Sequence, residues 1–205
     1  MFPISTYTGG IASTNGYFLI LPSGNVLVDA PDGVADWLDK RGAKVDFLLL
    51  THQHFDHVLD AAKVQANHGC RVIAFTDLSR DLTLERLYGA VSGSPFSVPE
   101  FAVDEHLQGK DSVEAAGVTW QVYHVPGHSP DSICFHREAE NLLFGGDVLF
   151  QSGVGRTDFP GGSSALLLQG IQDKLFCLPD TTTVYPGHGE PTTIGIERVT
   201  NPFLQ

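Results

Sequence analysis

The sequence predicts an α/β fold, a four-layer αββα sandwich in which two sheets pack together with helices on the outside. Short apolar segments typical of strands recur along the 205 residues, and segments typical of helices follow certain of them. Residues of the types that bind metals extend from His52 to His188, so one site would connect both halves of the chain. We therefore expect a single domain over residues 1–205.

Strand and helix signals alternate in the first half of the chain. Strands are predicted over residues 15–21, 25–29, 45–50 and 71–75. The turn residues Pro22-Ser23-Gly24 join the first two strands as a hairpin. Helices are predicted after Asp32, which can cap the first of them, from Val58 to Ala66, and from Asp77 to about Tyr88.

The segment over residues 89–100 contains two glycines and two prolines and has little periodicity. A loop of this length is often functional, so the segment is either a flap over a site or a plain surface connection. Later strands are predicted over residues 112–114, 118–125, 133–136, 141–144 and 182–185. Between the last two, Ser163 or Ser164 caps a helix with an inward apolar face.

A histidine-rich turn, Thr-His-Gln-His-Phe-Asp-His over residues 51–57, follows a buried apolar strand. His52 and His54 can share one ligand, because alternate residues of an extended segment point the same way. Asp56 and His57 fall where the chain turns into a helix and face a neighbouring point. A chance cluster is disfavoured, because crowded imidazoles without a ligand repel one another when they are protonated.

Three later loops repeat one design, in which a strand ends, the chain bends at glycine and one metal-binding residue follows. These loops cover residues 125–128, 144–147 and 185–188 and present His128, Asp147 and His188. Glycine lets the backbone approach where a side chain would obstruct it. Five histidines and two aspartates result, which suits two metal ions with nitrogen and oxygen ligands, Zn²⁺ or else Fe or Mn.

The composition excludes several kinds of partner. The net charge of −12 argues against nucleic acid and against anionic membrane surfaces, because both require basic patches. The three cysteines are far apart in the sequence, which is typical of buried thiols in a reducing compartment. Neither a secretory signal nor an apolar segment of membrane-spanning length is present, so we expect a cytoplasmic protein.

The chain resembles the metallo-β-lactamase superfamily over nearly its whole length, through the His-x-His-x-Asp-His motif at residues 52–57. The resemblance implies a four-layer sandwich of the metallo-β-lactamase type with two metal ions. The implied ligands are His52, His54 and His128 for the first ion, Asp56, His57 and His188 for the second, and Asp147 for both. Asp29 matches the aspartate that braces the motif turn in this superfamily.

Within the superfamily the chain is similar to the short glyoxalase II-like hydrolases, in residues 146–150, 155–158, 185–189 and 197–203. The resemblance implies hydrolysis of a small thioester such as S-lactoylglutathione, a glutathione conjugate. Two metal ions lower the pKa of a bridging water, so that hydroxide attacks the thioester carbonyl near neutral pH. Asp56 and Asp147 are then catalytic. Arg156 contacts the substrate or forms a structural ion pair, and Tyr185 contacts the substrate or packs at its strand end.

Other functions stay open. An iron persulfide dioxygenase resembles the chain in residues 155–159 and would hold one iron through His52 or His54, His128 and Asp147. A metallo-hydrolase that acts on another ester or on a lactone is a further alternative. A β-lactamase is less favoured, because subclasses with an Asp-His second site have Cys at the Asp147 position or lack the bridging carboxylate.

A non-catalytic binding protein is disfavoured, because seven converging polar groups are costly to bury unpaired. Hydrolases of this fold often pair, which leaves a homodimer open. Four histidines are not predicted as ligands. Of these, His124 lies four residues before His128 and could be near the site, and ordinary exposed or hydrogen-bonded positions are expected for His68, His106 and His136.

Overall fold

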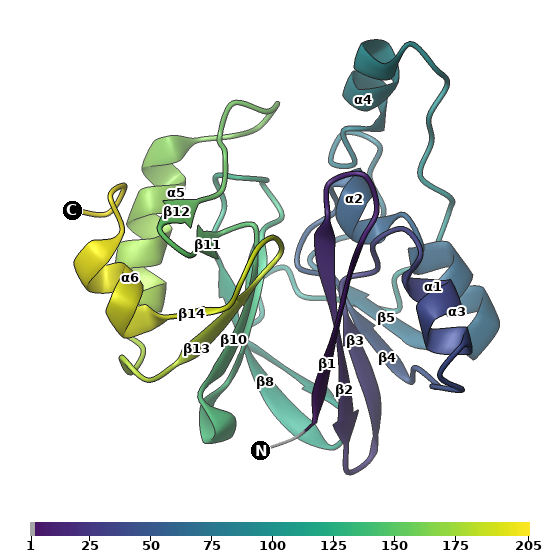
Figure 1. Cartoon of the computed structure of the whole chain (residues 1–205), viewed down its shortest axis with the longest axis horizontal. Helices are drawn as coiled ribbons and strands as arrows, with labels where there is room; N and C mark the ends of the chain where they lie inside the picture. The colour runs from purple at the N-terminus through teal and green to yellow at the C-terminus, as the bar shows by residue number, and fades with distance from the viewer. Residues whose placement is uncertain (1–2) are drawn as a thin grey trace.

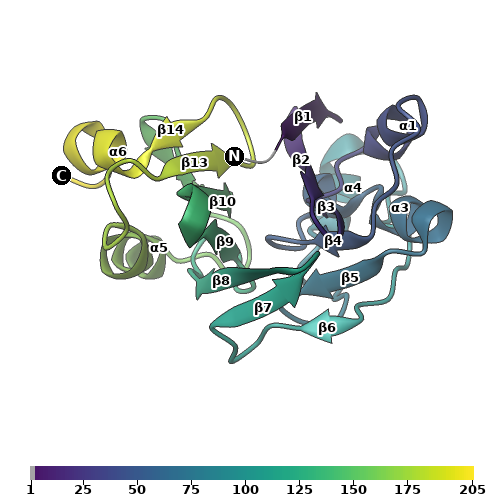
Figure 2. The ribbon, with the colours of Figure 1, turned by 90° about the horizontal axis from the view of Figure 1, so that it is seen from below.

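The computed structural model describes residues 3–205 and contains two six-stranded sheets whose inner faces share one core. Figure 1 shows helices α1 and α3 on the outer side of one sheet and helices α5 and α6 on the outer side of the other. The view from below shows the same layers (Figure 2). The predicted α/β sandwich with αββα layers is confirmed.

The first sheet comes from the N-terminal half, in the order β1-β2-β3-β4-β5-β6. Its strands are β1 (Ile4–Gly9), β2 (Thr14–Leu21), β3 (Gly24–Val28), β4 (Phe47–Leu49), β5 (Arg71–Ala74) and β6 (Glu105–His106). β1, β2 and β3 pair antiparallel, and β3 to β6 pair parallel. The helices of this half are α1 (Val34–Asp39), α2 (Phe55–Val58), α3 (Ala61–His68) and α4 (Glu85–Ser92).

The start of α1 differs from the prediction, which placed Asp32 as its cap. Gly33 is the N-cap, and no side chain caps the helix. Gly33 has a φ of 87°, which glycine adopts readily because it lacks a Cβ atom, so the backbone turns sharply into the helix. Val34 and Leu38 are then buried, together with Val64 of α3, against the outer face of the sheet.

The second sheet has the order β14-β13-β10-β9-β8-β7. Its strands are β7 (Ser112–Ala115), β8 (Val118–His124), β9 (Ile133–Arg137), β10 (Leu142–Gly146), β13 (Thr183–Pro186) and β14 (Thr192–Thr193). β10 and β13 pair parallel, and the other neighbours pair antiparallel. The remaining elements are a short hairpin of β11 (Leu149–Phe150) and β12 (Gly153–Val154), a 3₁₀ turn (Glu138–Glu140), α5 (Ser164–Gly170), a π-helical turn (Ile171–Leu175) and α6 (Ile194–Thr200).

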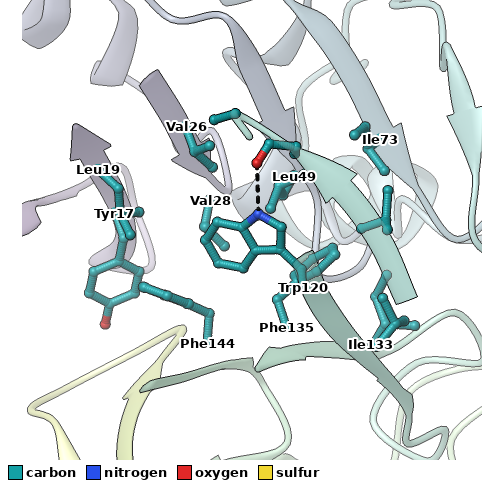
Figure 3. Packing of buried hydrophobic residues seen from close by; sticks show 14 of the residues in the cluster. Tyr17, Leu19, Val26, Val28, Leu49, Ile73, Trp120, Ile133, Phe135 and Phe144 are labelled. Atoms are coloured by element: carbon teal, nitrogen blue, oxygen red, sulfur yellow. Dashed lines mark hydrogen bonds between the residues drawn. The ribbon is translucent and has the colours of Figure 1, made fainter. Parts of the chain in front are cut away.

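Trp120 lies in the middle of the core between the two sheets (Figure 3). Its indole is fully buried, and Nε1 donates a hydrogen bond to the carbonyl oxygen of Ala115 at 3.3 Å. Val28 and Leu49 reach this core from the first sheet, and Phe144 reaches it from the second. Because β4 and β10 both carry core residues and then lead into candidate ligand loops, the packing of the sheets sets the distance between those loops.

The helix predicted from Asp77 to Tyr88 is misplaced, since α4 spans Glu85–Ser92. The side chain of Gln53 binds the segment before it. Its Oε1 accepts a hydrogen bond from Ser79 N at 2.8 Å, and its Nε2 donates to Asp77 O at 3.0 Å. Side-chain bonds of this kind replace those that a helix would make, so α4 forms later and takes up part of the predicted loop 89–100.

Four elements were not predicted, β1, β6, β14 and α6, because they are short or largely exposed and lack a clear apolar period. Glu197 ties α6 to the rest of the protein. Its fully buried carboxylate accepts hydrogen bonds from Thr192 Oγ1 at 2.6 Å, Ser152 N at 2.9 Å and Asn201 Nδ2 at 2.8 Å. No helix within residues 3–205 combines the length and the apolar character that crossing a bilayer requires.

Candidate metal centre

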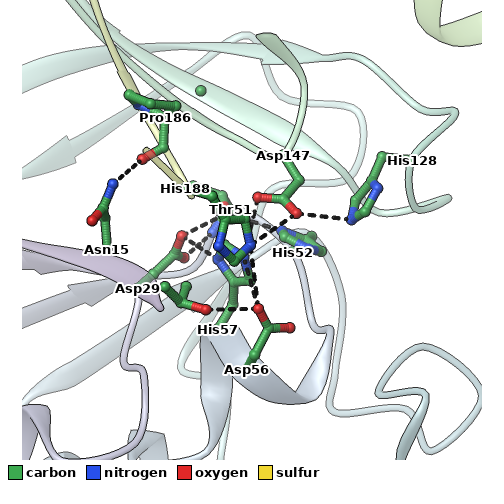
Figure 4. A network of polar contacts seen from close by, with 12 residues as sticks. Asn15, Asp29, Thr51, His52, Asp56, His57, His128, Asp147, Pro186 and His188 are labelled. Carbon is green, nitrogen blue, oxygen red and sulfur yellow. Dashed lines mark hydrogen bonds and ion pairs between the residues drawn. The ribbon is translucent and has the colours of Figure 1, made fainter. Parts of the chain in front are cut away.

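The candidate ligands meet where four strands end, at one edge of the sandwich. Figure 4 labels all of them except His54. The turn over residues 52–57 follows β4 of the first sheet. His128, Asp147 and His188 come after β8, β10 and β13 of the second sheet. The site therefore forms only when the two sheets pack together, as the spread of these residues along the sequence predicted.

His52, His54 and His128 form the first group of donors. One ring nitrogen of each lies within 4.8 Å of the others, and all three side chains are buried. The ring centroids of His54 and His128 are 4.4 Å apart, and those of His52 and His54 are 4.6 Å apart. Nitrogen atoms arranged in this way match three ligands of one ion.

Asp56, His57 and His188 form the second group, whose ligand atoms also lie within 4.8 Å of one another. Oδ2 of Asp56 lies 3.3 Å from Nε2 of His188 and 3.6 Å from Nε2 of His57. Asp56 and His188 are partly exposed, so this group opens toward solvent while His57 is fully buried beneath it.

Asp147 lies between the two groups. Its Oδ1 lies 3.2 Å from Nε2 of His57, and its Oδ2 lies 3.3 Å from Nε2 of both His128 and His188. The carboxylate thus faces donors of the first group and of the second at once. This is the position that the resemblance implied for a residue shared by two ions.

Several of these atoms have no hydrogen-bond partner among the described residues, although they are buried. They are Nε2 of His52, His57 and His128 and Oδ1 of Asp147. Buried polar atoms without partners are costly, and a cation would satisfy all four. The donors are nitrogen and oxygen atoms without thiolate, which fits Zn²⁺, Fe or Mn. The residues present therefore fit a metal centre.

Burial and neighbouring charges shift the pKa values of histidines in the two groups in opposite directions. Burial lowers the pKa of His54 to about 3 and that of His52 well below its usual value, so both rings are neutral and able to bind a metal. Burial also lowers the pKa of His188, but hydrogen bonds with Asp147 and Asp56 outweigh it and raise that pKa to about 10. Metal binding at the second group would therefore release a proton.

Comparison with known proteins identifies the family. Residues 9–188 match the family model described as the Metallo-beta-lactamase superfamily. The chain belongs to this superfamily. Hydroxyacylglutathione hydrolase GloC of Haemophilus influenzae is 35% identical over 185 residues, which cover 88% of this chain and 87% of that protein.

Two solved structures resemble this superfamily member over nearly its whole length. The structure described as BLEG-1 B3 metallo-beta-lactamase is 35% identical with a TM-score of 0.85, and the match covers 98% of this chain and 99% of that one. The structure described as TTHA1623 in a di-iron-bound form is 33% identical with a TM-score of 0.83, covering 98% of this chain and 100% of that one. This superfamily member thus shares its fold with both structures over 98% of its chain.

The aspartate that the superfamily resemblance singled out, Asp29, lies directly behind the motif turn. Its Oδ1 accepts a hydrogen bond from Thr51 N at 2.8 Å, and its Oδ2 lies 2.8 Å from both Thr51 Oγ1 and His57 Nδ1. A proton on Nδ1 would leave Nε2 of His57 free to bind a metal. Asp29 has a φ of 59°, an uncommon conformation that these contacts hold in place.

Residues near the N-terminus also support the site, and the sequence analysis missed them. Thr14 Oγ1 donates to Asp56 Oδ2 at 2.7 Å. Asn15 Nδ2 donates to Pro186 O at 3.1 Å and to Gly189 O at 2.9 Å, and Tyr17 Oη donates to Pro186 O at 2.6 Å. The only signal in the sequence was the presence of polar residues at the start of an apolar strand.

Glycine in the ligand loops has the role that was predicted. A Cβ atom on Gly187 would collide with Oδ1 of Asp147 and would lie 2.6 Å from Cε1 of His57. A Cβ atom on Gly146 would collide with the side chain of Thr51, and Gly146 has a φ of 49°. Close approach of the loops to the turn therefore requires glycine at both positions.

A cavity of about 460 Å³ lies beside the candidate ligands, several of which form part of its wall. Its remaining wall is mostly apolar and contains Phe55, Leu84, Phe150, Val154, Arg156 and Phe159. The guanidinium of Arg156 pairs with both carboxylate oxygens of Asp158, at 2.7 and 2.6 Å, and lies 4.1 Å from the ring centroid of Phe159. The structural ion pair considered for Arg156 is thus present, although its side chain lines the cavity.

Tyr185, for which contact with substrate and packing at the strand end were both predicted, is not among the residues that line this cavity. Its ring packs 5.2 Å from that of Phe144 and 5.3 Å from that of Tyr17, in the core between the sheets. It occupies this place because residues of β13 alternate between the core and the outer face. These contacts fit packing at the strand end, and contact with substrate stays an untested prediction.

The remaining histidines lie outside the two groups. His124 stacks on Phe75, and its Nε2 lies 2.8 Å from Pro130 O. His106 pairs with Asp77 at 2.7 Å. His136 differs from the prediction, because it is buried and neither ring nitrogen has a hydrogen-bond partner among residues 3–205. Its pKa is lowered, mainly by burial, so the neutral ring is favoured there.

Proposed function

We propose that this chain is a dimetal hydrolase that cleaves thioesters such as S-lactoylglutathione. The observation that carries the proposal is the position of Asp147, within 3.3 Å of Nε2 of His57, His128 and His188 and so between two groups of three donors. The relative GloC, at 35% identity, bears the name hydroxyacylglutathione hydrolase. The geometry thus supports a pair of ions, and the name of the relative supports hydrolysis of a glutathione thioester.

In this proposal His52, His54 and His128 hold one ion, Asp56, His57 and His188 hold the other, and Asp147 binds both. We propose Zn²⁺ for both positions, with Fe or Mn as alternatives, because all the donors are nitrogen and oxygen atoms. One structural relative is described as a di-iron form, which supports Fe among the alternatives. Such ions supply a nucleophile from water near neutral pH and an electrophile for the carbonyl oxygen.

Asp56 has a second role in the proposal. Burial would raise the pKa of this carboxyl group, but His57 and hydrogen bonds from His188 and Thr14 lower it to about 2. The ionised carboxylate lines the cavity, where it can accept a hydrogen bond from the attacking water and orient it. The leaving thiolate has a pKa of about 8.5, so it departs without a strong general acid.

The second candidate is an iron persulfide dioxygenase, which the segment over residues 155–159 supports by resemblance. Such an enzyme needs one iron and three ligands. A second complete group, Asp56, His57 and His188, favours the dimetal hydrolase instead.

The test combines metal analysis with three assays on the same reconstituted protein. We expect about two transition-metal ions per chain and hydrolysis of S-lactoylglutathione. Oxygen uptake with glutathione persulfide and cleavage of a β-lactam are the competing activities, the latter because one relative is described as a metallo-beta-lactamase. One iron per chain with oxygen uptake, or cleavage of the β-lactam alone, would overturn the proposal. His106→Ala, outside both groups, is the matched control and should keep full metal content.

A further inference from the structure

Residues 85–98, which include α4, form an excursion that is closed at its base. Arg80 Nη1 donates to Oε2 of Glu85 at 2.8 Å and to the carbonyl oxygen of Val98 at 2.5 Å. The same Glu85 oxygen accepts a hydrogen bond from Val98 N at 2.8 Å. The two ends of the excursion are therefore held together, which reduces the conformational freedom of the segment between them.

The excursion is also attached to the metal-binding turn. Phe55, which lies between His54 and Asp56 in the motif, packs with its ring centroid 4.7 Å from that of Tyr88 and 5.2 Å from that of Phe96. The rings of Tyr88 and Phe96 are 4.6 Å apart. This aromatic cluster fixes α4 beside the candidate ligands.

A second cleft of about 490 Å³ lies between α4 and the loop that carries Phe159. Phe55, Leu84, Arg156 and Phe159 line both this cleft and the cavity beside the candidate ligands, so the two adjoin each other. The cleft adds two exposed apolar side chains of α4, Val91 at 81% exposure and Leu87 at 41%.

Charge in the cleft is already neutralised. Arg156 and Asp158 are the charged residues of its wall, and they pair with each other through two hydrogen bonds. The wall therefore offers no unpaired charge to a charged group of the substrate, whereas burying apolar surface against Val91, Leu87 and Phe159 is favourable.

We infer that the cleft binds an apolar acyl group, an aliphatic chain or an aryl ring attached to the scissile carbonyl. The inference rests on the proposed function, because it assigns the group that lies beside the carbonyl at the metal centre. The chain is then a hydrolase for thioesters with apolar acyl groups, and small polar acyl groups such as lactoyl leave the cleft empty.

The test measures kcat/KM for glutathione thioesters that differ only in the acyl group: acetyl, lactoyl, hexanoyl and phenylacetyl. We expect kcat/KM to rise at least about tenfold from acetyl to hexanoyl. The double variant Leu87→Asp/Val91→Asp should bring this ratio close to one, because a carboxylate then faces the acyl chain. Val199→Asp is the control, since Val199 is an exposed valine of α6, 71% exposed and outside the cleft, and it should keep the ratio.

A ratio near one in the natural protein, or one that the double variant leaves unchanged, overturns the inference and leaves the proposed function standing. A dimer that the double variant dissociates, with no change in the ratio, would assign the apolar face to contact between two copies and also overturns the inference. If no thioester is cleaved, the proposed function fails. The cleft is then tested by calorimetry on the metal-loaded protein, where hexanoate should bind at least about tenfold more tightly than acetate. Equal affinities overturn the inference.

Discussion

Nδ1 of His57 lies 2.8 Å from Oδ2 of Asp29, a residue 28 positions earlier in the chain. The same carboxylate accepts hydrogen bonds from the backbone N–H and the hydroxyl of Thr51. It therefore connects the end of β3 to both ends of the motif turn. Because Asp29 orients the ring of His57, it sets the direction in which Nε2 points toward Asp147 and Asp56.

Replacing Asp29 by Asn tests this relationship. The amide N–H groups of Asn would face the donors that now surround the carboxylate, which are the backbone N–H and hydroxyl of Thr51 and Nδ1 of His57. The ring of His57 would therefore lose its orientation. Asn tolerates the left-handed backbone at this position, which keeps the test local. We expect metal affinity to fall by about 10–100-fold, measured by competition with a chromophoric chelator. Asp39→Asn, on the exposed surface of α1, is the control. Unchanged affinity in Asp29→Asn would show that the bond has no role in metal binding.

Asp147→Ala should remove the one carboxylate that contacts both groups of donors. We expect fewer than two metal ions per chain and a loss of thioester hydrolysis of at least about 10²–10³-fold, with an unchanged far-UV circular dichroism spectrum. His128→Ala should have the same effect on turnover through the first group. Near-native turnover in either variant would contradict the assigned roles.

Gly187→Ala should damage the site although it replaces no candidate ligand. The new methyl group would meet Asp147 and His57, so the loop that carries His188 must move away. We expect a loss of stability of about 1–3 kcal/mol in urea unfolding, together with weaker binding of the second ion. Gly153→Ala is the matched control, because the nearest atom to its Cβ would lie at 3.7 Å. Equal losses in both variants would contradict the steric explanation.

Asp131 predicts a dependence of stability on pH. It is buried, it accepts a hydrogen bond from Ser129 Oγ, and burial raises its pKa from 3.8 to about 6. The folded state therefore retains a proton that the unfolded state releases between about pH 4 and 6. Its contribution to stability is fully present below about pH 4 and is lost as the pH rises through 6.

Asp131→Asn removes this titration. Between pH 4 and 8 the free energy of unfolding of the natural protein should fall, relative to that of the variant, by up to about 3 kcal/mol. Urea unfolding of both proteins after chelation measures the difference. A difference that is the same at every pH would show that Asp131 does not titrate in this range.

Much of the local structure was predictable, because its signals lie within a few residues. The apolar residues of β4 and the motif that follows indicated a buried strand leading into a metal-binding turn. Ser163 caps α5 as one of the two predicted residues, with its hydroxyl accepting a hydrogen bond from Leu166 N. The bends at Gly146 and Gly187 were predicted from their place between a strand and a ligand-type residue.

Contacts between segments that are distant in the sequence determine other features, which local signals could not predict. Gln53 binds the segment near Ser79, so the helix expected there forms later, as α4. For Tyr185 the sequence left two roles open, and the structure places its ring against those of Tyr17 and Phe144.

By itself, the sequence determined the family, the layered fold and the residue types that converge on the candidate metal centre, because apolar period and ligand spacing are local properties. Tertiary structure alone decided that Asn15 holds the loop on both sides of His188, more than 170 residues away, and that α4 forms an apolar wall beside the site. Hydrogen bonds and packing between distant segments depend on how the two sheets meet, and no short stretch of sequence encodes that geometry.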